Sequence, residues 1–179
     1  MPRLTIVGFI LSMTVQLHGQ ANYPHIPPQD SLATICEIPL QTLTRKIAAG
    51  PAQQDLYLDD DKLFTGWACQ VFPDSEHRYR YVQVVKGEIT RQIGYYTNGQ
   101  LDHDFHLSDG KSIGYERMWM ADGHPYIRYY YSAPGVMHGL QRRWHTNGKI
   151  AWEAHYDHGR ELSSRQYDRA GRLLAPRGH

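Results

Sequence analysis

Neither sign of charge dominates this chain of 179 residues. Lysine and arginine together number 19, against 18 aspartates and glutamates, so the formal net charge is +1 with neutral histidine. Nucleic acids and anionic membrane surfaces favour proteins with a strongly basic face. The balance therefore predicts that neither of them is the main partner.

Cysteine is scarce, because Cys36 and Cys69 are the only two in the chain. Neither has a Cys-x-x-Cys partner or a nearby histidine, which disfavours a metal pair or a catalytic thiol. In an exported protein they can pair with each other. The loop would be worth roughly 3–4 kcal/mol in the chain-entropy model. The sequence leaves the distance between them open, so Cys36 and Cys69 are a disulfide candidate.

Long apolar runs are missing apart from one at residues 4–15, which follows Arg3. A stable bilayer anchor needs about 20 residues, so this run is too short. Gly19-Gln20-Ala21 offers small residues where a signal peptidase reads. We therefore predict a secretory signal at residues 1–21, cleaved after Ala21, and a periplasmic or extracellular protein without a stable membrane anchor. The alternative is a buried N-terminal strand or helix.

Helical patterns are rare, and one short segment has the clearest one. Residues 39–49 carry apolar side chains at helical spacing, and Gly50-Pro51 would end the helix. We predict a short N-terminal helix here. It belongs to a leader and capping segment of residues 22–62, which covers an end or a face of the sheet that follows.

The chain does contain a repeat. Five turn pairs have second members 24, 24, 25 and 23 residues apart: Asp74-Ser75, Asn98-Gly99, Asp122-Gly123, Asn147-Gly148 and Ala170-Gly171. Between the turns, apolar and polar residues alternate as in half-buried strands. A repeat of this period indicates stacked supersecondary units. We predict a mainly β fold, an extended single antiparallel meander of β-hairpin repeats over residues 63–174, with a disordered tail at residues 175–179.

An aromatic residue or valine before each turn fixes the expected register. A two-residue turn would pair Trp119 with Tyr126, whereas the three-residue loop Ala121-Asp122-Gly123 pairs it with Pro125. The second option keeps the ring with the apolar set, so we predict Trp119 on the same face as Tyr129. Arg117, Arg142 and Arg165 fall on this face. A polar slot between the apolar positions holds Arg80, Asp104, Arg128 and Glu153.

The repeat, written Gly-x4-[Trp/Tyr]-x2-[Asn/Asp]-Gly with an aromatic strand and another glycine turn after it, resembles the MORN-repeat variant of proteins grouped with the YwqK-type antitoxins. Residues 114–123 and 139–148 match it well, residues 93–101 match half a unit, and residues 66–75 and 162–171 are degenerate. The likeness covers residues 63–174. It implies a bacterial binding scaffold with no catalytic residues and with a protein ligand. Combined with export, it is compatible with an immunity-like role in the periplasm.

The aromatic face is the predicted binding site, because tyrosine, tryptophan and arginine dominate binding hot spots. Its members are Tyr95, Arg117, Trp119, Tyr129, Arg142, Trp144 and Trp152. We expect an exported, non-catalytic scaffold that binds another protein, with oligomers through unpaired sheet edges as an option. Two alternatives stay open. Either residues 22–62 cover the rings, or the aromatic row stacks on glycan or cell-wall polymer.

Catalytic and metal-binding patterns are weak. Gly110-Lys111-Ser112-Ile113-Gly114 has the Gly-x-Ser-x-Gly form of a nucleophile elbow, but both glycines belong to the repeat, and an elbow needs a strand-to-helix turn. Asp102, Asp104 and His106 alternate along one strand and are candidate metal ligands, with a solvated polar face as the simpler interpretation. A metal-assisted hydrolase built on them is the enzymatic alternative. We predict no enzyme, no cofactor and no resident metal.

Overall fold

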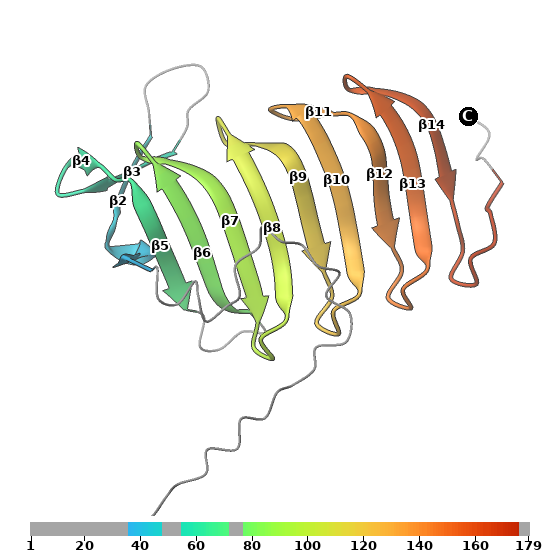
Figure 1. Cartoon of the computed structure of the whole chain (residues 1–179), viewed down its shortest axis with the longest axis horizontal. Coiled ribbons are helices and arrows are strands. Elements are labelled where there is room, and N and C mark those ends of the chain that lie inside the picture. Colours follow the sequence, from blue (N-terminus) through green and yellow to red (C-terminus); the bar gives the residue numbers. More distant parts are fainter. Residues whose placement is uncertain (1–35, 48–54, 72–76, 176–179) are drawn as a thin grey trace, which may run out of the picture.

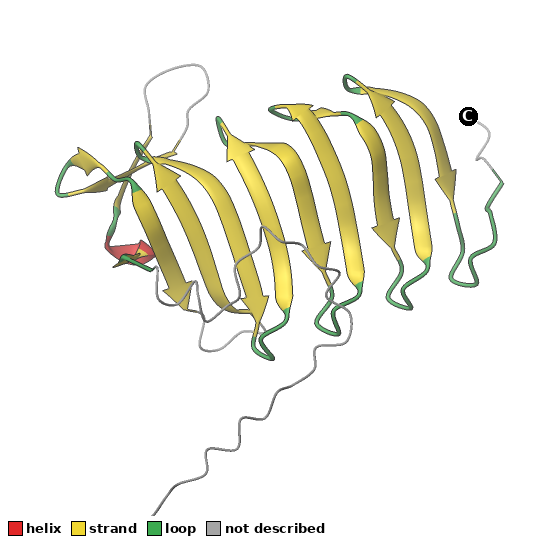
Figure 2. Cartoon of the chain, in the orientation of Figure 1, coloured by secondary structure: helices red, strands yellow, loops and turns green. Residues whose placement is uncertain are grey.

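The computed structural model describes residues 36–47, 55–71 and 77–175, most of which lie in β-strands (Figure 2). The prediction of a mainly β fold is confirmed. The predicted signal at residues 1–21, the leader at residues 22–35 and most of the predicted tail, residues 176–179, lie outside the described residues.

A sheet of eleven strands forms the body of the protein (Figure 1). From β5 onward its strands pair antiparallel in chain order, so each hairpin lies beside the previous one and the predicted meander is confirmed. The strands are β5 (Gly66–Val71), β6 (His77–Val85), β7 (Glu88–Tyr96), β8 (Leu101–Ser108), β9 (Lys111–Trp119), β10 (Pro125–Ala133), β12 (Gly139–Trp144), β13 (Ile150–Asp157) and β14 (Arg160–Gln166). The short β11 (Val136–Met137) pairs with β10 beside this path.

The N-terminal part differs from the predicted helix. The described residues form β1 (Ile38–Pro39), parallel to β5, then a 3-10 turn, η1 (Leu40–Thr42), and β2 (Thr44–Ile47). β2 joins β3 (Asp55–Asp59) and β4 (Lys62–Leu63) in a second, three-stranded sheet. The predicted α-helix is wrong over these residues, because pairing with β3 satisfies the backbone groups that a helix would satisfy internally.

Three-residue loops join β7 to β8, β9 to β10 and β12 to β13 at one end of the strands, as predicted. In the loop before β10, Gly123 N donates to Met120 O at 2.8 Å, and Met120 N donates to His124 O at 2.8 Å. Gly123 has a φ of +87°, a left-handed conformation that glycine adopts without steric penalty. The predicted register is confirmed: Trp119 pairs with Pro125.

A bulge beside each of these loops changes which residues share a face. Trp119 pairs with Pro125, but the next pair is Met118 with Ile127, so Tyr126 is an extra residue in β10. Asp102 in β8 and Ala151 in β13 are extra residues at the equivalent places. A one-residue slip moves every following side chain to the other face.

Asparagine side chains link neighbouring loops. Asn98 Nδ2 donates to Ala121 O in the next loop at 2.7 Å, and Asn147 Nδ2 donates to Arg169 O at 2.7 Å. Because each asparagine also accepts from a backbone N–H two residues on, one side chain closes its own loop and fixes the spacing to the next.

Two apolar clusters lie on the two faces of the sheet near β5. One consists of Tyr81, Ile93, Tyr95, Leu101 and Trp119, with Cys36, Trp67 and Cys69 packed against it. The other consists of Leu40, Leu43, Ala68, Val82 and Val84. Cys36 and Cys69 form a disulfide with a Cα–Cα distance of 5.8 Å. The described N-terminal segment therefore contributes to the core on both faces, and part of the predicted aromatic face is core.

Two buried tyrosines make stability sensitive to alkaline pH. Burial raises the pKa of Tyr95, and burial with the nearby Glu116 carboxylate raises that of Tyr131. The folded state therefore favours the neutral phenol. This contribution is fully present below the unfolded-state value of about 10 and is lost as pH rises through the higher folded-state pKa. Ultraviolet titration should show Tyr95 ionising only as the protein unfolds. Tyr95→Phe should reduce the amplitude of this late ionisation, which Tyr131 shares.

Candidate functional site

One charged residue from each of six strands lines up across the sheet. The direct pairs are Asp104 with Arg117, Arg117 with Arg128, Arg128 with Arg142, Arg142 with Glu153, and Glu153 with Arg165. Paired residues share a face. We call these six residues the charge row, its central members Arg117, Arg128 and Arg142 the arginine triplet, and the face that carries them the arginine face.

A buried carboxylate anchors one end of the triplet. Asp104 is fully buried, and its Oδ1 lies 2.8 Å from Arg91 Nε. Its Oδ2 lies 3.7 Å from Arg117 Nη1. Asp104 therefore balances two arginines that are themselves mostly buried, with side-chain exposures of 13% and 15%.

A second carboxylate anchors the other end. Glu153 Oε2 lies 3.3 Å from Arg142 Nε, and Glu153 Oε1 accepts from Tyr167 OH at 2.9 Å. Arg165 Nη1 lies 3.9 Å from the same Oε1. Both carboxylates of the charge row are thus engaged with the arginines on either side of Arg128.

Arg128, in the middle of the triplet, is exposed and lies over an aromatic ring. Its Cζ is 5.5 Å from the centroid of Tyr115, and Arg117 Cζ is 4.4 Å from the same centroid. The Tyr115 ring is 5.0 Å from that of Tyr130. Among the described residues no ion pair involves Arg128. Like charges on directly paired residues destabilise a sheet. The Tyr115 ring attracts the guanidinium groups of Arg117 and Arg128, and so it offsets part of the repulsion around Arg128, with which neither carboxylate forms an ion pair.

A depression of about 350 Å³ adjoins the triplet, lined by Tyr115, Arg128, Tyr130, His138, Gly139, Leu140 and Arg142. Guanidinium groups hold carboxylates through paired N–H donors in a fixed geometry. The ring faces and Leu140 add apolar contact area. This arrangement suits a carboxylate-bearing group whose neighbouring atoms are apolar.

The structure divides the predicted binding face between two faces. Arg117, Arg142, Tyr95, Trp119 and Trp144 lie on the arginine face, but Tyr95 and Trp119 are only 3% and 7% exposed and belong to the core. The bulges put the remaining two members of the predicted set on the opposite face.

Tyr129 and Trp152 are these two residues. Their rings lie 6.1 Å apart in an edge-to-face arrangement, and Arg143 Cζ is 5.3 Å from the Trp152 centroid. The prediction that Tyr129 shares a face with Trp119 is therefore wrong, because Tyr126 is an extra residue between them.

Sequence reasoning missed that Arg128 joins Arg117 and Arg142. It assigned Arg128 to a polar slot separate from theirs, whereas the bulge brings both sets onto the same face. Arg80, which the sequence analysis placed in the same polar slot, does not belong to the charge row. Ile93 pairs with Asp104 on one side and with Tyr81, not Arg80, on the other. The loop type gives no signal for this slip, since the bulge of a three-residue loop lies at its last residue, here Gly123, whereas the extra residue Tyr126 lies beyond the pair of Trp119 with Pro125.

The candidate metal ligands Asp102, Asp104 and His106 do not form a metal-type cluster among the described residues. Asp102 Oδ2 lies 2.6 Å from His103 Nδ1, at the bulge, while Asp104 is held by Arg91. His106 pairs in register with Arg91. Each aspartate thus has a cationic or imidazole partner from outside this candidate set.

The Gly-x-Ser-x-Gly motif lies in a hairpin. Gly110 is in the turn between β8 and β9, and Ser112 and Gly114 lie in β9 itself. Ser112 Oγ donates to Glu116 Oε2 at 2.7 Å. The local structure is strand, turn, strand, which differs from the strand-to-helix turn of an elbow.

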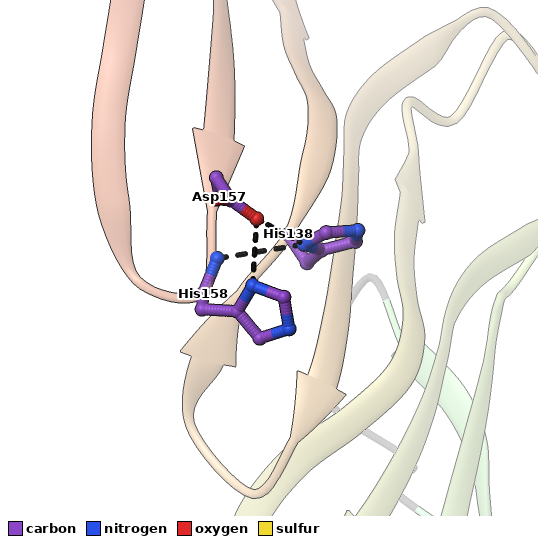
Figure 3. A group of neighbouring side chains, drawn as sticks. All are labelled: His138, Asp157 and His158. Carbon is purple, nitrogen blue, oxygen red and sulfur yellow. Dashed lines mark hydrogen bonds and ion pairs between the residues drawn. The ribbon is translucent and has the colours of Figure 1, made fainter.

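A second group of polar side chains lies at the other end of the strands, away from the three-residue loops (Figure 3). It consists of His138, Asp157 and His158, and one ligand-type atom from each lies within 4.8 Å of the others. Sequence reasoning did not group these three residues. The group forms only when the turn after β13 stacks on the link between β11 and β12, so spacing along the chain gave no signal.

Within the described residues, no helix has the length and apolar character needed to cross a membrane. Comparison of the chain with protein-family models, with curated proteins and with solved structures gives no match.

Proposed function

We propose that this chain is a non-catalytic repeat scaffold that binds an acidic segment of another protein through the arginine triplet. The observation that carries the proposal is the direct pairing of three arginines on adjacent strands beside a depression with aromatic walls. Folding alone gives no reason for this placement, because directly paired like charges cost stability. An anionic partner would relieve the repulsion.

The setting of the triplet favours a protein over a carbohydrate ligand. Sugars stack on open ring faces, whereas the exposed Tyr115 ring already has the guanidinium groups of Arg117 and Arg128 against it. Arginine and tyrosine together are typical of binding hot spots. The resemblance to the MORN-repeat variant and the predicted secretory signal support an exported, immunity- or antitoxin-like role as part of the same proposal.

The test is a charge change at Arg128 with a matched control at Arg143. Both arginines are exposed and each lies over an aromatic ring, at 5.5 and 5.3 Å, but on opposite faces. We expect Arg128→Gln to weaken partner binding by roughly tenfold or more, because a hydrogen bond to a charged group is worth about 1.5–3 kcal/mol. Arg143→Gln should bind like the unaltered protein.

The first measurement is photo-crosslinking in the native host, with the crosslinker at position 130. The recovery of each crosslinked adduct is quantified for the unaltered protein, for Arg128→Gln and for Arg143→Gln. A fluorescent poly-glutamate peptide, titrated at two salt concentrations, measures affinity directly. Equal recovery and equal peptide affinity for the two arginine variants would contradict the proposal. Co-sedimentation with cell-wall polysaccharide that depends on Tyr115 would favour the glycan alternative.

A further inference from the structure

His138, Asp157 and His158 come from two segments that meet where turns join the ends of the strands. His138 lies in the link between β11 and β12, Asp157 ends β13, and His158 begins the turn to β14. His138 Nδ1 lies 3.5 Å from Asp157 Oδ1, and His158 Nδ1 lies 2.6 Å from the same oxygen. The two imidazole rings are 4.8 Å apart, and the three side chains point toward one another (Figure 3).

Backbone contacts hold the two segments together independently of these side chains. Gly159 N donates to Met137 O at 2.8 Å, which fixes the turn against the link. The preceding hairpin forms the same junction, where Gly135 N donates to Ser112 O at 2.8 Å. There the positions that correspond to the three polar residues hold Ile113, Ala133 and Pro134. The fold thus builds this junction without ligand-type side chains and does not require the two histidines and the aspartate, although His138 Nδ1 here accepts from His158 N at 3.4 Å.

We propose that His138, Asp157 and His158 bind a divalent transition-metal ion of the zinc class. Two imidazoles and a carboxylate are ligands that Zn²⁺ accepts, with bonds of about 2.0–2.2 Å. Two ligands of a tetrahedral ion are then about 3.4 Å apart. The 3.5 Å between His138 Nδ1 and Asp157 Oδ1 already matches this spacing. The 2.6 Å contact of His158 must open, which a rotation of its exposed side chain achieves.

Three protein ligands leave a coordination position for water or for a group from another molecule. His138 also lines the depression beside the arginine triplet. An ion at this site would therefore add positive charge to the rim of that depression. The metal site does not depend on the proposed protein partner, and it is tested without one.

The test is a titration of the purified, untagged full chain with Zn²⁺, followed by calorimetry, and with Co²⁺, followed by its visible absorption. We expect one saturable site and a raised unfolding temperature in the presence of Zn²⁺. His138→Asn and His158→Asn should each weaken binding by roughly 10–100-fold or more, since loss of an outer-shell partner alone has that effect. His155→Asn, at an exposed histidine of β13 outside the group, should bind as the unaltered chain does.

The outcomes are separable. Loss of the site in the two variants, with circular dichroism unchanged, supports the proposal. Binding that is absent, non-saturable, or reduced equally by His155→Asn overturns it, because the chain has eleven histidines that could bind metal non-specifically. A Co²⁺ spectrum typical of octahedral water coordination, unaffected by the variants, also overturns it.

Discussion

Replacing Asp104 by asparagine is expected to lower the free energy of unfolding by about 3–5 kcal/mol, the usual cost of removing one partner from a buried ion pair. Asp104 is fully buried and balances Arg91 and Arg117. Asparagine has nearly the same shape, so the loss comes from charge and not from a cavity. Two largely buried guanidiniums would remain without their carboxylate, next to the rest of the arginine triplet.

The chain offers a matched control in Asp55. Its Oδ1 also lies 2.8 Å from an arginine Nε, that of Arg45, but this pair is exposed, with side-chain exposures of 62% and 37%. Exposed ion pairs contribute about 0–1 kcal/mol, so Asp55→Asn should be nearly neutral. Urea unfolding of both variants decides the matter. If the two variants lose free energy of unfolding by amounts that agree within about 0.5 kcal/mol, the burial of Asp104 does not determine how much it stabilises the protein.

The hairpin architecture could be predicted because its determinants are local. A three-residue loop such as Ala121-Asp122-Gly123 needs a left-handed last residue, and glycine supplies it. Each such loop fixes the pair that flanks it, which is why the pairing of Trp119 with Pro125 followed from the turn alone. Because the same loop recurs in the repeat, the same pairing is predicted for the other hairpins.

The assignment of residues to faces could not be predicted in the same way. It depends on whether an extra residue follows the loop, and the extra residues Asp102, Tyr126 and Ala151 have no chemistry in common. Alternation is counted from the loop, so one uncounted residue reverses every later assignment. The error separated Arg128 from Arg117 and thereby hid the triplet.

The sequence predicted an N-terminal helix wrongly and did not predict the histidine group, and the two have a related reason. Leu40 and Leu43 are buried as a helix would require, but Ile47 is 65% exposed and pairs with Asp55 in β3. Pairing between distant segments overrode a local preference. The contact of His138 with His158 likewise arises from stacking of two segments, which no local pattern records.

Removing the disulfide is expected to lower the free energy of unfolding by about 3–4 kcal/mol. Cys36 and Cys69 are 33 residues apart, and closing a loop of this length restricts the unfolded chain by that amount in the chain-entropy model. Both residues also pack against the apolar cluster around Tyr81. The variant Cys36→Ser/Cys69→Ser, compared with the oxidised protein by urea unfolding, measures the effect. A reducing agent should destabilise the unaltered protein similarly and leave the variant unchanged.

The loss should also be local. Each hairpin of this sheet contacts mainly its neighbours, so stability is close to a sum of units and their interfaces. The disulfide attaches the segment before β1 to β5, at one end of the sheet. Hydrogen exchange should therefore accelerate most in β5 and β6 and least in β12 and β13. Uniform acceleration along the sheet would show instead that all its hairpins unfold as one cooperative unit, and the disulfide would then stabilise the whole sheet equally.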